Sequence, residues 1–311
     1  MSIERDPEDR RKIKLSQRGL IDKVVNQYPK SPTDRHRHHS PADSRLFDVV
    51  SDGDRLASAE EKSEFLSVLM TLMYVARLTR PDILLPVTFL AGRTHCADLR
   101  DIRHLERVIR YLEGTAELGV HLNCSSLQLH CSCDASFSVH TPGLSTKGHT
   151  GYIIGFGPEM SYIHGRSGKQ KTASTSACDA EIIALCEATK MCVWLRNIIS
   201  ELQITPLEQI VIYQDNQSCI QMCTNETLTG NSKHLLSKIT YVHGYTQSSA
   251  VTLQYVPTDE MTADVLTKAL HGKPFDKHVT QMMGLKWSKY LSTEPYENLF
   301  EVNLVVAFAR A

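Results

Sequence analysis

The chain has 311 residues and a formal net charge of −1 at pH 7, so no global basic field points to nucleic acid, although local patches can still do so. Hydrophobic residues make up 41% and charged residues 22% of the chain, which is ordinary for a soluble globular protein. The nine cysteines lack the paired spacing of a zinc site. Neither a membrane span nor a signal-peptide core is present in the sequence. We therefore expect a soluble, intracellular protein, cytoplasmic or nuclear, that does not associate with membranes.

The first part of the chain divides into a polar region and a helical region. Residues 1–60 are polar and irregular, with a short helical pattern at 20–25. In residues 61–116, apolar side chains recur at three- and four-residue steps, which is typical of helices that bury one stripe. This pattern predicts two helices before a third that ends at Gly114, a common helix terminator.

From about residue 118 the apolar pattern changes to one of short strands and longer helices. Alternation and short apolar runs predict strands at 127–133, 151–156, 160–164, 210–213 and 251–256. Wider spacing predicts helices at 177–202, 233–246 and 262–270. Strands followed by helices alternating with strands indicate an α/β domain with helices packed on a sheet.

Four acidic residues occupy related places in this second region. Asp134 and Asp215 each follow an apolar strand. Glu181 lies in the first turns of the long helix, and Asp264 begins the last one. Strand ends at one edge of an α/β sheet meet at a crevice, where carboxylates repel one another unless cations neutralise them. The pattern therefore favours bound Mg²⁺; the alternative, that the acids only cap strands and helices, suits any one of them better than all four.

Four sequence blocks resemble the ribonuclease H domain of copia-type retrotransposon Pol polyproteins. They are CSCDASF (131–137), STSACDAEIIAL (174–185), YQDNQSCI (213–220) and VPTDEMTADVLTK (256–268). The earlier block LTRPDI (78–83) is also similar to these polyproteins, and the resemblance covers roughly residues 2–285. The family's Asp, Glu, Asp and Asp fall on Asp134, Glu181, Asp215 and Asp264.

The resemblance implies a ribonuclease H-like fold, with a mixed five-stranded sheet flanked by helices. A mainly helical thumb or connection segment of the reverse transcriptase would occupy residues 1–116, the ribonuclease H-like domain 117–285, and a C-terminal tail 286–311. The implied enzyme is an endonuclease that hydrolyses the RNA strand of an RNA–DNA hybrid with two Mg²⁺ ions, for which Mn²⁺ can substitute. Its catalytic residues and metal ligands are the same four acids, Asp134, Glu181, Asp215 and Asp264.

Several polar residues are candidates for contact with the hybrid. Lys169, Lys171 and Lys233 can meet phosphates, and His234 is a further candidate near them. Asn216 can donate to a sugar hydroxyl or, equally well, stabilise a turn. The expected partners are the hybrid and the rest of a reverse transcriptase polyprotein.

Two departures from the family qualify this hypothesis. The Tyr-x-Asp-Asp block of the polymerase is absent from these residues, so no polymerase activity is expected of this chain alone. The loop before the last acid, Thr258–Thr262, lacks the His that ribonucleases H often place there. The alternative function is a catalytically inactive or domesticated module that binds nucleic acid or a protein partner. An integrase-like nuclease is disfavoured because its acids have a different spacing.

Overall fold

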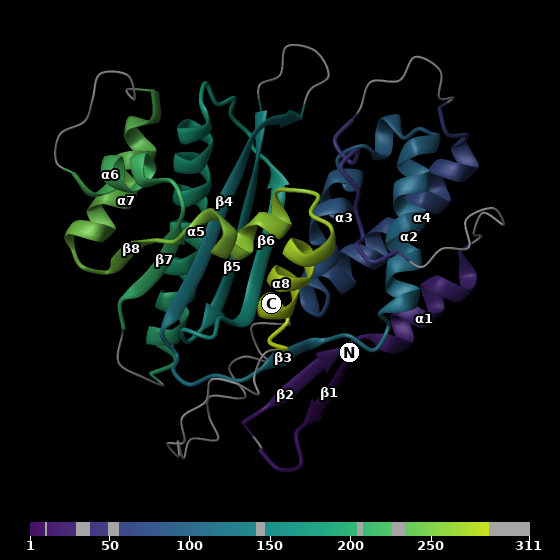
Figure 1. Cartoon of the computed structure of the whole chain (residues 1–311), viewed down its shortest axis with the longest axis horizontal. Helices are drawn as coiled ribbons and strands as arrows, with labels where there is room; N and C mark the ends of the chain where they lie inside the picture. Colours follow the sequence, from purple (N-terminus) through teal and green to yellow (C-terminus); the bar gives the residue numbers. More distant parts are fainter. Residues whose placement is uncertain are drawn as a thin grey trace.

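The structure is a computed structural model of the whole chain, and it describes residues 1–9, 11–28, 38–48, 56–140, 147–203, 208–225 and 234–285. Two sheets and the helices around them make up this part of the chain (Figure 1). The larger sheet stands at the centre, with a helical segment on one side of it and a pair of helices on the other.

The larger sheet has five strands in the order β6-β5-β4-β7-β8. Their bounds are β4 Leu129–His140, β5 Lys147–Phe156, β6 Ser161–Lys169, β7 Ile210–Gln214 and β8 Val251–Tyr255. The first three pair antiparallel as a meander, whereas β7 pairs parallel to β4, and β8 parallel to β7. The chain therefore leaves β6 and returns to the opposite side of β4, which makes the β4–β7 pair the point where the strand order reverses.

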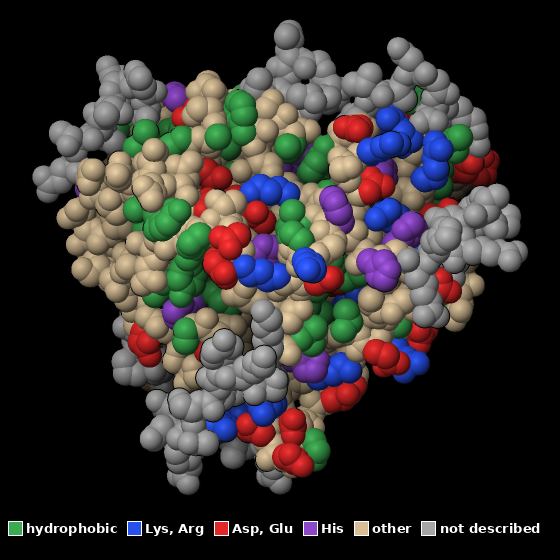
Figure 2. Space-filling view, viewed as in Figure 1, with side chains coloured by type: hydrophobic (Ala, Val, Ile, Leu, Met, Phe, Trp, Pro, Cys, Tyr) green, Lys and Arg blue, Asp and Glu red, His purple; other side chains and the backbone are tan. Residues whose placement is uncertain are grey.

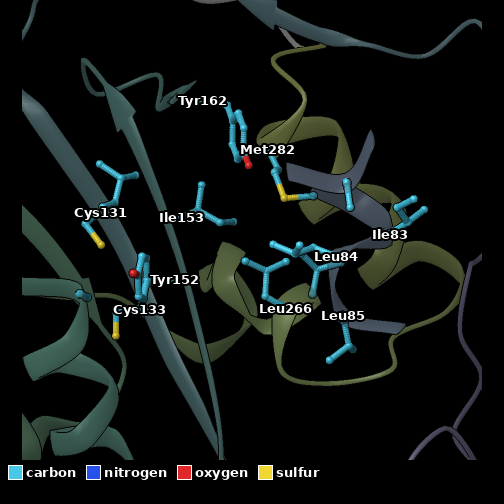
Figure 3. Close-up of a cluster of buried hydrophobic side chains, with 14 of the residues drawn as sticks. Ile83, Leu84, Leu85, Cys131, Cys133, Tyr152, Ile153, Tyr162, Leu266 and Met282 are labelled. Atoms are coloured by element: carbon cyan, nitrogen blue, oxygen red, sulfur yellow. The ribbon is translucent and has the colours of Figure 1, made fainter. Parts of the chain in front are cut away.

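Helices cover one face of this sheet. The long helix α5, Ala177–Glu201, packs on β4 and β5, and α6 (Gln217–Thr224) and α7 (Leu236–Gln247) pack against α5 and β8. Because side chains alternate along a strand, Tyr152 and Ile153 point to opposite faces. Figure 3 shows Tyr152 together with Cys131 and Cys133 on the α5 side, and Ile153 on the other side.

Upstream of the sheet lie four α-helices and two 3₁₀ turns within the described residues. They are α1 Arg18–Gln27, α2 Ala59–Leu78, η1 Pro81–Ile83, α3 Leu84–Ala91, η2 Thr94–Cys96 and α4 Leu99–Gly114. Capping boxes begin two of the helices: Ser58 with Glu61 for α2, and Asp98 with Asp101 for α4. These reciprocal bonds satisfy free backbone N–H groups and explain where the two helices start.

A buried ion pair joins the ends of α2 and α4. Arg80 donates to Asp82 at 2.7 Å and to the Thr115 carbonyl at 2.9 Å, and the Tyr111 hydroxyl donates to Asp82 at 2.7 Å. Both charged side chains are fully buried. Removing one partner would leave an uncompensated buried charge, so this cluster specifies how the helices meet.

The second face of the sheet is covered by this helical segment and by the last turns of the described chain. Helix α3 packs against β6, while η5 (Thr262–Leu266) and α8 (Gly272–Met282) follow η4 (Thr258–Glu260), and η5 packs against β4 and β5. Leu84, Leu266 and Met282 meet Ile153 in one apolar cluster (Figure 3). The helical segment and the sheet therefore share a core.

A smaller sheet corrects the prediction that residues 1–60 are irregular outside one short helix. Strands β1 (Ser2–Arg5), β2 (Ile13–Ser16) and β3 (Val120–Leu122) pair antiparallel in that order. Each is short, and β2 finds its partner more than a hundred residues away, so local periodicity gives little sign of it. The predicted helix at 20–25 is confirmed by α1.

Two further predictions need correction near the acids. Strand β4 does not end at Asp134 but continues to His140, because β5 stays paired with it beyond the last pair with β7. Asp264 does not begin an α-helix: residues 262–266 form a 3₁₀ turn, and α8 starts only at Gly272. The short apolar run in 262–270 fits either helix type, because both expose an i, i+3 stripe.

The predicted fold class is confirmed: a ribonuclease H-like mixed five-stranded sheet flanked by helices and preceded by a mainly helical segment. Among the described residues, none of the helices combines the length and apolar character that crossing a membrane requires.

Candidate active site

Three carboxylates from distant parts of the chain meet beside the central sheet. Asp134 lies on β4, Glu181 in the first turns of α5, and Asp215 directly after β7. One oxygen of each lies within 4.8 Å of the others. The described residues thus bring together three of the four predicted acids, as potential ligands of one cation.

Strand register explains why Asp134 and Asp215 face each other. The last parallel pair between β4 and β7 is Ser132 with Tyr213. Two residues further along both strands lead to Asp134 and Asp215, beyond the point where the strands stop pairing. This is the carboxyl end of a parallel pair where the strand order reverses, the usual place for a ligand in an α/β sheet.

Glu181 is held by hydrogen bonds to both neighbouring strands. Its Oε1 accepts from the Ala135 backbone N–H at 3.2 Å, and its Oε2 accepts from Gln214 Nε2 at 3.2 Å. The Gln214 Oε1 in turn accepts from the backbone N–H groups of Asp215 and Asn216, at 2.8 and 3.0 Å. Gln214 therefore ties Glu181 to the loop that carries Asp215.

The other acids are oriented by residues of η4 and by the two residues that follow η5. Asp134 accepts a hydrogen bond from the Thr267 hydroxyl, and Asp215 accepts one from the Thr258 hydroxyl at 2.9 Å. Asp264 is not part of the group of three: its Oδ1 accepts from Lys268 Nζ at 2.7 Å. The same ammonium lies 3.5 Å from Asp134 Oδ1, so Lys268 bridges the fourth acid to the cluster.

Burial and mutual repulsion oppose ionisation of these acids. Burial, reinforced by the charges of Asp134 and Asp215, raises the pKa of Glu181 well above its usual range. Burial also raises the pKa of Asp134, against the attraction of Lys268. The pKa of Asp264 rises to about 7, through burial and then the charge of Asp134. A bound cation would favour the ionised form of these carboxyl groups, and the resulting carboxylates would be strong ligands for it.

The donor chemistry fits a hard divalent cation. Asp134, Glu181 and Asp215 offer only carboxylate oxygens, the ligands that Mg²⁺ and Mn²⁺ prefer. Among the described residues no other group of three acidic, His or Cys side chains is so closely gathered. Burial opposes the charge of Lys268, but Asp134 and Asp264 raise its pKa above the usual value, so it stays an ammonium and already offsets part of their repulsion.

The predicted nucleic-acid contacts have varied surroundings. Lys169 and Lys171 are exposed at the end of β6 and just after it. Asn216 caps α6, with its Oδ1 accepting from the Cys219 N–H at 2.9 Å, which matches the turn-stabilising alternative. His234 Nε2 lies 3.1 Å from Asp179 Oδ2, and Lys233 falls outside the described residues.

Charged side chains gather on the outer surface near this site. Figure 2 shows acidic and basic groups side by side in the middle of the face over which η4, η5 and α8 lie in Figure 1. In these elements, Lys277 of α8 pairs with Glu260 and Asp259 of η4, at 2.8 and 3.8 Å. This face therefore mixes both signs of charge.

Three supporting residues were not identified from the sequence: Gln214, Thr267 and Lys268. The separation of four between Asp264 and Lys268 was a usable signal, because residues at i and i+4 face each other on a helix. Gln214 and Thr267 gave no such signal, since their roles depend on contacts between β7, α5, β4 and η5.

Comparisons with known proteins relate the chain to transposon polyproteins. No family model matches the chain. It is 29% identical over 224 residues to the retrovirus-related Pol polyprotein from transposon RE1 of Arabidopsis thaliana, covering 71% of this chain and 15% of that protein. It is 31% identical over 212 residues to the polyprotein from transposon RE2 of the same plant, covering 68% of this chain and 14% of that protein. The chain thus spans about one seventh of the length of these relatives.

A solved structure gives a weaker match. LC11-RNase H1, isolated from compost by a metagenomic approach, aligns with 45% of this chain and 92% of its own chain, at 14% identity and a TM-score of 0.34. By its sequence, the chain is homologous to retrovirus-related Pol polyproteins of copia-type transposons.

Proposed function

We propose that this chain is a metal-dependent endonuclease that hydrolyses the RNA strand of RNA–DNA hybrids. The observation that carries the proposal is the convergence of Asp134, Glu181 and Asp215, whose oxygens lie within 4.8 Å of one another. The ribonuclease H-like fold and the relationship to Pol polyproteins support a ribonuclease H type of function in general. The fourth acid, Asp264, is proposed to complete the catalytic set.

The side chains present fit phosphodiester hydrolysis. Bound Mg²⁺ or Mn²⁺, as two ions in the proposed site, would supply an activated water and stabilise the leaving oxygen. Gln214 and the Ala135 N–H hold both oxygens of Glu181 in place, and Thr258 orients Asp215. A water oxygen would form the new bond to phosphorus as the bond to the 3′-oxygen breaks and that oxygen takes up a proton. The products would carry 5′-phosphate and 3′-hydroxyl ends.

The proposed partners follow from the same argument. We propose that the hybrid lies across the acidic site, with Lys169 and Lys171 near its phosphates and His234 and Lys233 as further contacts. Shape and 2′-hydroxyl groups would distinguish the hybrid from DNA. We further propose that 117–285 act as the ribonuclease H-like domain, and that 1–116 correspond to the thumb or connection of a larger reverse transcriptase polyprotein.

One observation favours a second candidate, a module that binds nucleic acid without cutting it. The Lys268 ammonium lies between Asp134 and Asp264, 3.5 and 2.7 Å from their oxygens, and neutralises part of the site without any metal. In a degenerate enzyme this ion pair alone would keep the carboxylates together.

Strand-specific cleavage separates the two candidates. The parent is incubated with an RNA–DNA hybrid labelled on either strand, in Mg²⁺ or in EDTA, beside Asp134→Asn. We expect the parent to cut only the RNA strand and only with the divalent cation, and the variant to lose at least about a hundredfold in rate, the usual scale for a group that stabilises the transition state. Asp259→Asn is the matched control, because that acid is 81% exposed and lies on η4 outside the cluster.

The outcomes are distinct. An Asp134→Asn protein that cuts as fast as Asp259→Asn would overturn the assignment of the site. A parent that binds the hybrid but never cuts it would support the binding module instead.

A further inference from the structure

Two histidines lie buried between the sheet and the helical segment, away from the three carboxylates. His149 on β5 is completely buried and His140 at the end of β4 nearly so. Two aromatic rings of the upstream segment pack against them. The ring centroid of Phe47 lies 5.5 Å from that of His140 and 5.7 Å from that of His149. Phe89 of α3 stacks on His140, with 5.8 Å between the ring centroids. The proposed catalytic chemistry uses neither histidine.

The imidazoles form the start of a continuous hydrogen-bonded chain. His140 Nε2 lies 2.8 Å from His149 Nδ1, and His149 Nε2 lies 2.6 Å from Ser167 Oγ. The Ser167 hydroxyl donates to the Leu266 carbonyl at 2.7 Å. The chain thus runs from β4 through β5 and β6 into η5.

Only one arrangement of protons satisfies this chain. The Leu266 carbonyl can only accept, so the Ser167 hydroxyl donates its single proton to that carbonyl. Ser167 must then accept from His149, whose proton is therefore on Nε2. A neutral His149 leaves Nδ1 free to accept, so His140 donates from its own Nε2. Burial lowers the pKa of His149 well below the usual value for a histidine, and it lowers the pKa of His140 to about 4. Both shifts agree with two neutral rings.

The far end of the chain is the turn that carries Asp264. Strand pairing sets Asp134, Gly151 and Ser167 in one line across β4, β5 and β6. The end of η5 and the residue after it lie close to that line: Ser167 donates to the Leu266 carbonyl, and Asp134 accepts from Thr267. Figure 3 shows Leu266 pointing from η5 into the apolar cluster shared with α3. The turn is thus fixed by its backbone on the sheet and by its side chain on the helices.

Two imidazoles buried at such an interface need a reason. Burying polar groups costs free energy unless every one is paired, and apolar side chains would fill the same space without that requirement. A chain of paired groups, by contrast, fixes geometry, because its proton positions allow only one arrangement of donors and acceptors. The one backbone group that it fixes outside the three strands is the Leu266 carbonyl, two residues after Asp264.

We propose that His140, His149 and Ser167 form a positioning chain through which the upstream helical segment holds η5, and with it Asp264 and Lys268, against Asp134. The catalytic consequence rests on the proposed function, whereas the positioning itself does not. His140, His149 and Ser167 are positioning residues, since they reach the acids only through the backbone of the turn.

The direct test measures how firmly η5 is held in the metal-free protein. Ser167→Ala removes the link to Leu266 together with the longer hydrogen bond, 3.3 Å, from the Thr88 hydroxyl of α3, and Ser167→Thr restores a hydroxyl. Ser161→Ala is the matched control: Ser161 is also buried on β6 and also donates to a backbone carbonyl, but that of Asn123, away from η5. Hydrogen exchange is followed at the backbone N–H groups of Asp264, Thr267 and Lys268, which are bonded within the turn.

We expect Ser167→Ala to speed exchange at these three amides by roughly 3- to 10-fold, the scale of one lost hydrogen bond. Ser167→Thr should return to the parent rate, and Ser161→Ala should leave η5 unchanged whatever it does to overall stability. His149→Phe, which keeps a ring but breaks the chain one link earlier, should act like Ser167→Ala. Equal exchange in Ser167→Ala and the parent, or equal loosening in Ser161→Ala, would overturn the proposal. So would a ¹⁵N spectrum that places the His149 proton on Nδ1.

The metal site supplies the second readout. Mn²⁺ binding measured by electron paramagnetic resonance should weaken several-fold in Ser167→Ala and not in Ser161→Ala, because only the first loosens Asp264 and Lys268. Looser η5 amides with unchanged Mn²⁺ affinity would confine the chain to a structural role and overturn its catalytic consequence. A parent that binds no Mn²⁺ would contradict the proposed function, and the exchange data would still decide whether the chain positions η5.

Discussion

At the scale of single residues, the site consists of acids that the fold keeps from ionising easily. Asp134, Glu181 and Asp264 are all buried, and each has a raised pKa. The sequence was enough to predict that Asp134 and Asp215 lie close together, because each follows an apolar strand pattern. The i, i+4 spacing of Asp264 and Lys268 was a signal for their pairing, but the sequence could not show that Asp264 stays apart from the other three acids, because that depends on the geometry of a 3₁₀ turn.

In the metal-free protein, Asp264→Asn should become progressively more stable relative to the parent as the pH rises. The Asp264 pKa is about 7 in the fold, against 3.8 for the ordinary side chain. The folded parent therefore binds more protons than the unfolded chain between those values, and this contribution to its stability is lost as the pH rises through them. Asparagine mimics the neutral acid and does not titrate. Thermal melts in EDTA should show the Tm of the variant gaining on the parent by several degrees from pH 4 to pH 8. A constant Tm difference would contradict the assigned pKa.

At the scale of elements, the decisive contact is between η5 and the sheet. Ser132 accepts from the Ala263 N–H at 3.1 Å and Ser136 donates to the Thr267 carbonyl at 2.8 Å, so the turn lies flat on β4. The sequence predicted the strands and helices here because their periods are local. It could not predict that the polar side of β4 is buried, because the alternation of apolar and polar residues along a strand normally indicates that the polar side faces solvent.

Gly151→Ala should dislodge η5. A Cβ at Gly151 would lie 2.6 Å from the Thr267 methyl, 2.9 Å from Leu266 Cβ and 3.2 Å from the Ala263 carbonyl. Overpacking of this kind costs about 1–3 kcal/mol in the free energy of unfolding. Chemical denaturation would measure that loss. The rate of hybrid cleavage should fall by more than the decrease in folded protein accounts for. Gly168→Ala is the control, since a Cβ there meets nothing within 4 Å. A Gly151→Ala protein as stable and active as this control would show that η5 does not need the close approach.

At the scale of the whole molecule, the helical segment and the ribonuclease H-like sheet share one core. Helix α3 packs on β6, and β2 of the first residues pairs with β3, which precedes the large sheet. The sequence predicted both regions from their different periods. It gave no sign of how they join, because pairing between β2 and β3 and packing between α3 and β6 are long-range contacts that no local pattern encodes.

The two regions should therefore unfold together. Leu84 of α3 is buried in the shared cluster. Truncating a core leucine to alanine lowers the free energy of unfolding by about 2–5 kcal/mol, and we expect a loss of this size for Leu84→Ala. Calorimetry should show one transition for the parent, and Leu84→Ala should shift the whole of it to lower temperature. Two transitions, of which only the first moved, would show that the helical segment is a separate folding unit.

The most direct test of the central claim is the binding of a divalent cation to the three carboxylates. Mn²⁺ is titrated into the parent, Glu181→Gln and Asp259→Asn, and bound ion is followed by electron paramagnetic resonance. Glu181→Gln keeps the size of the side chain and removes one charged ligand from the cluster. A cation site made of the three carboxylates predicts that the parent and Asp259→Asn bind Mn²⁺ alike, and that Glu181→Gln binds it at least about tenfold more weakly, as expected when one charged ligand is lost. Equal affinity in all three proteins would contradict it.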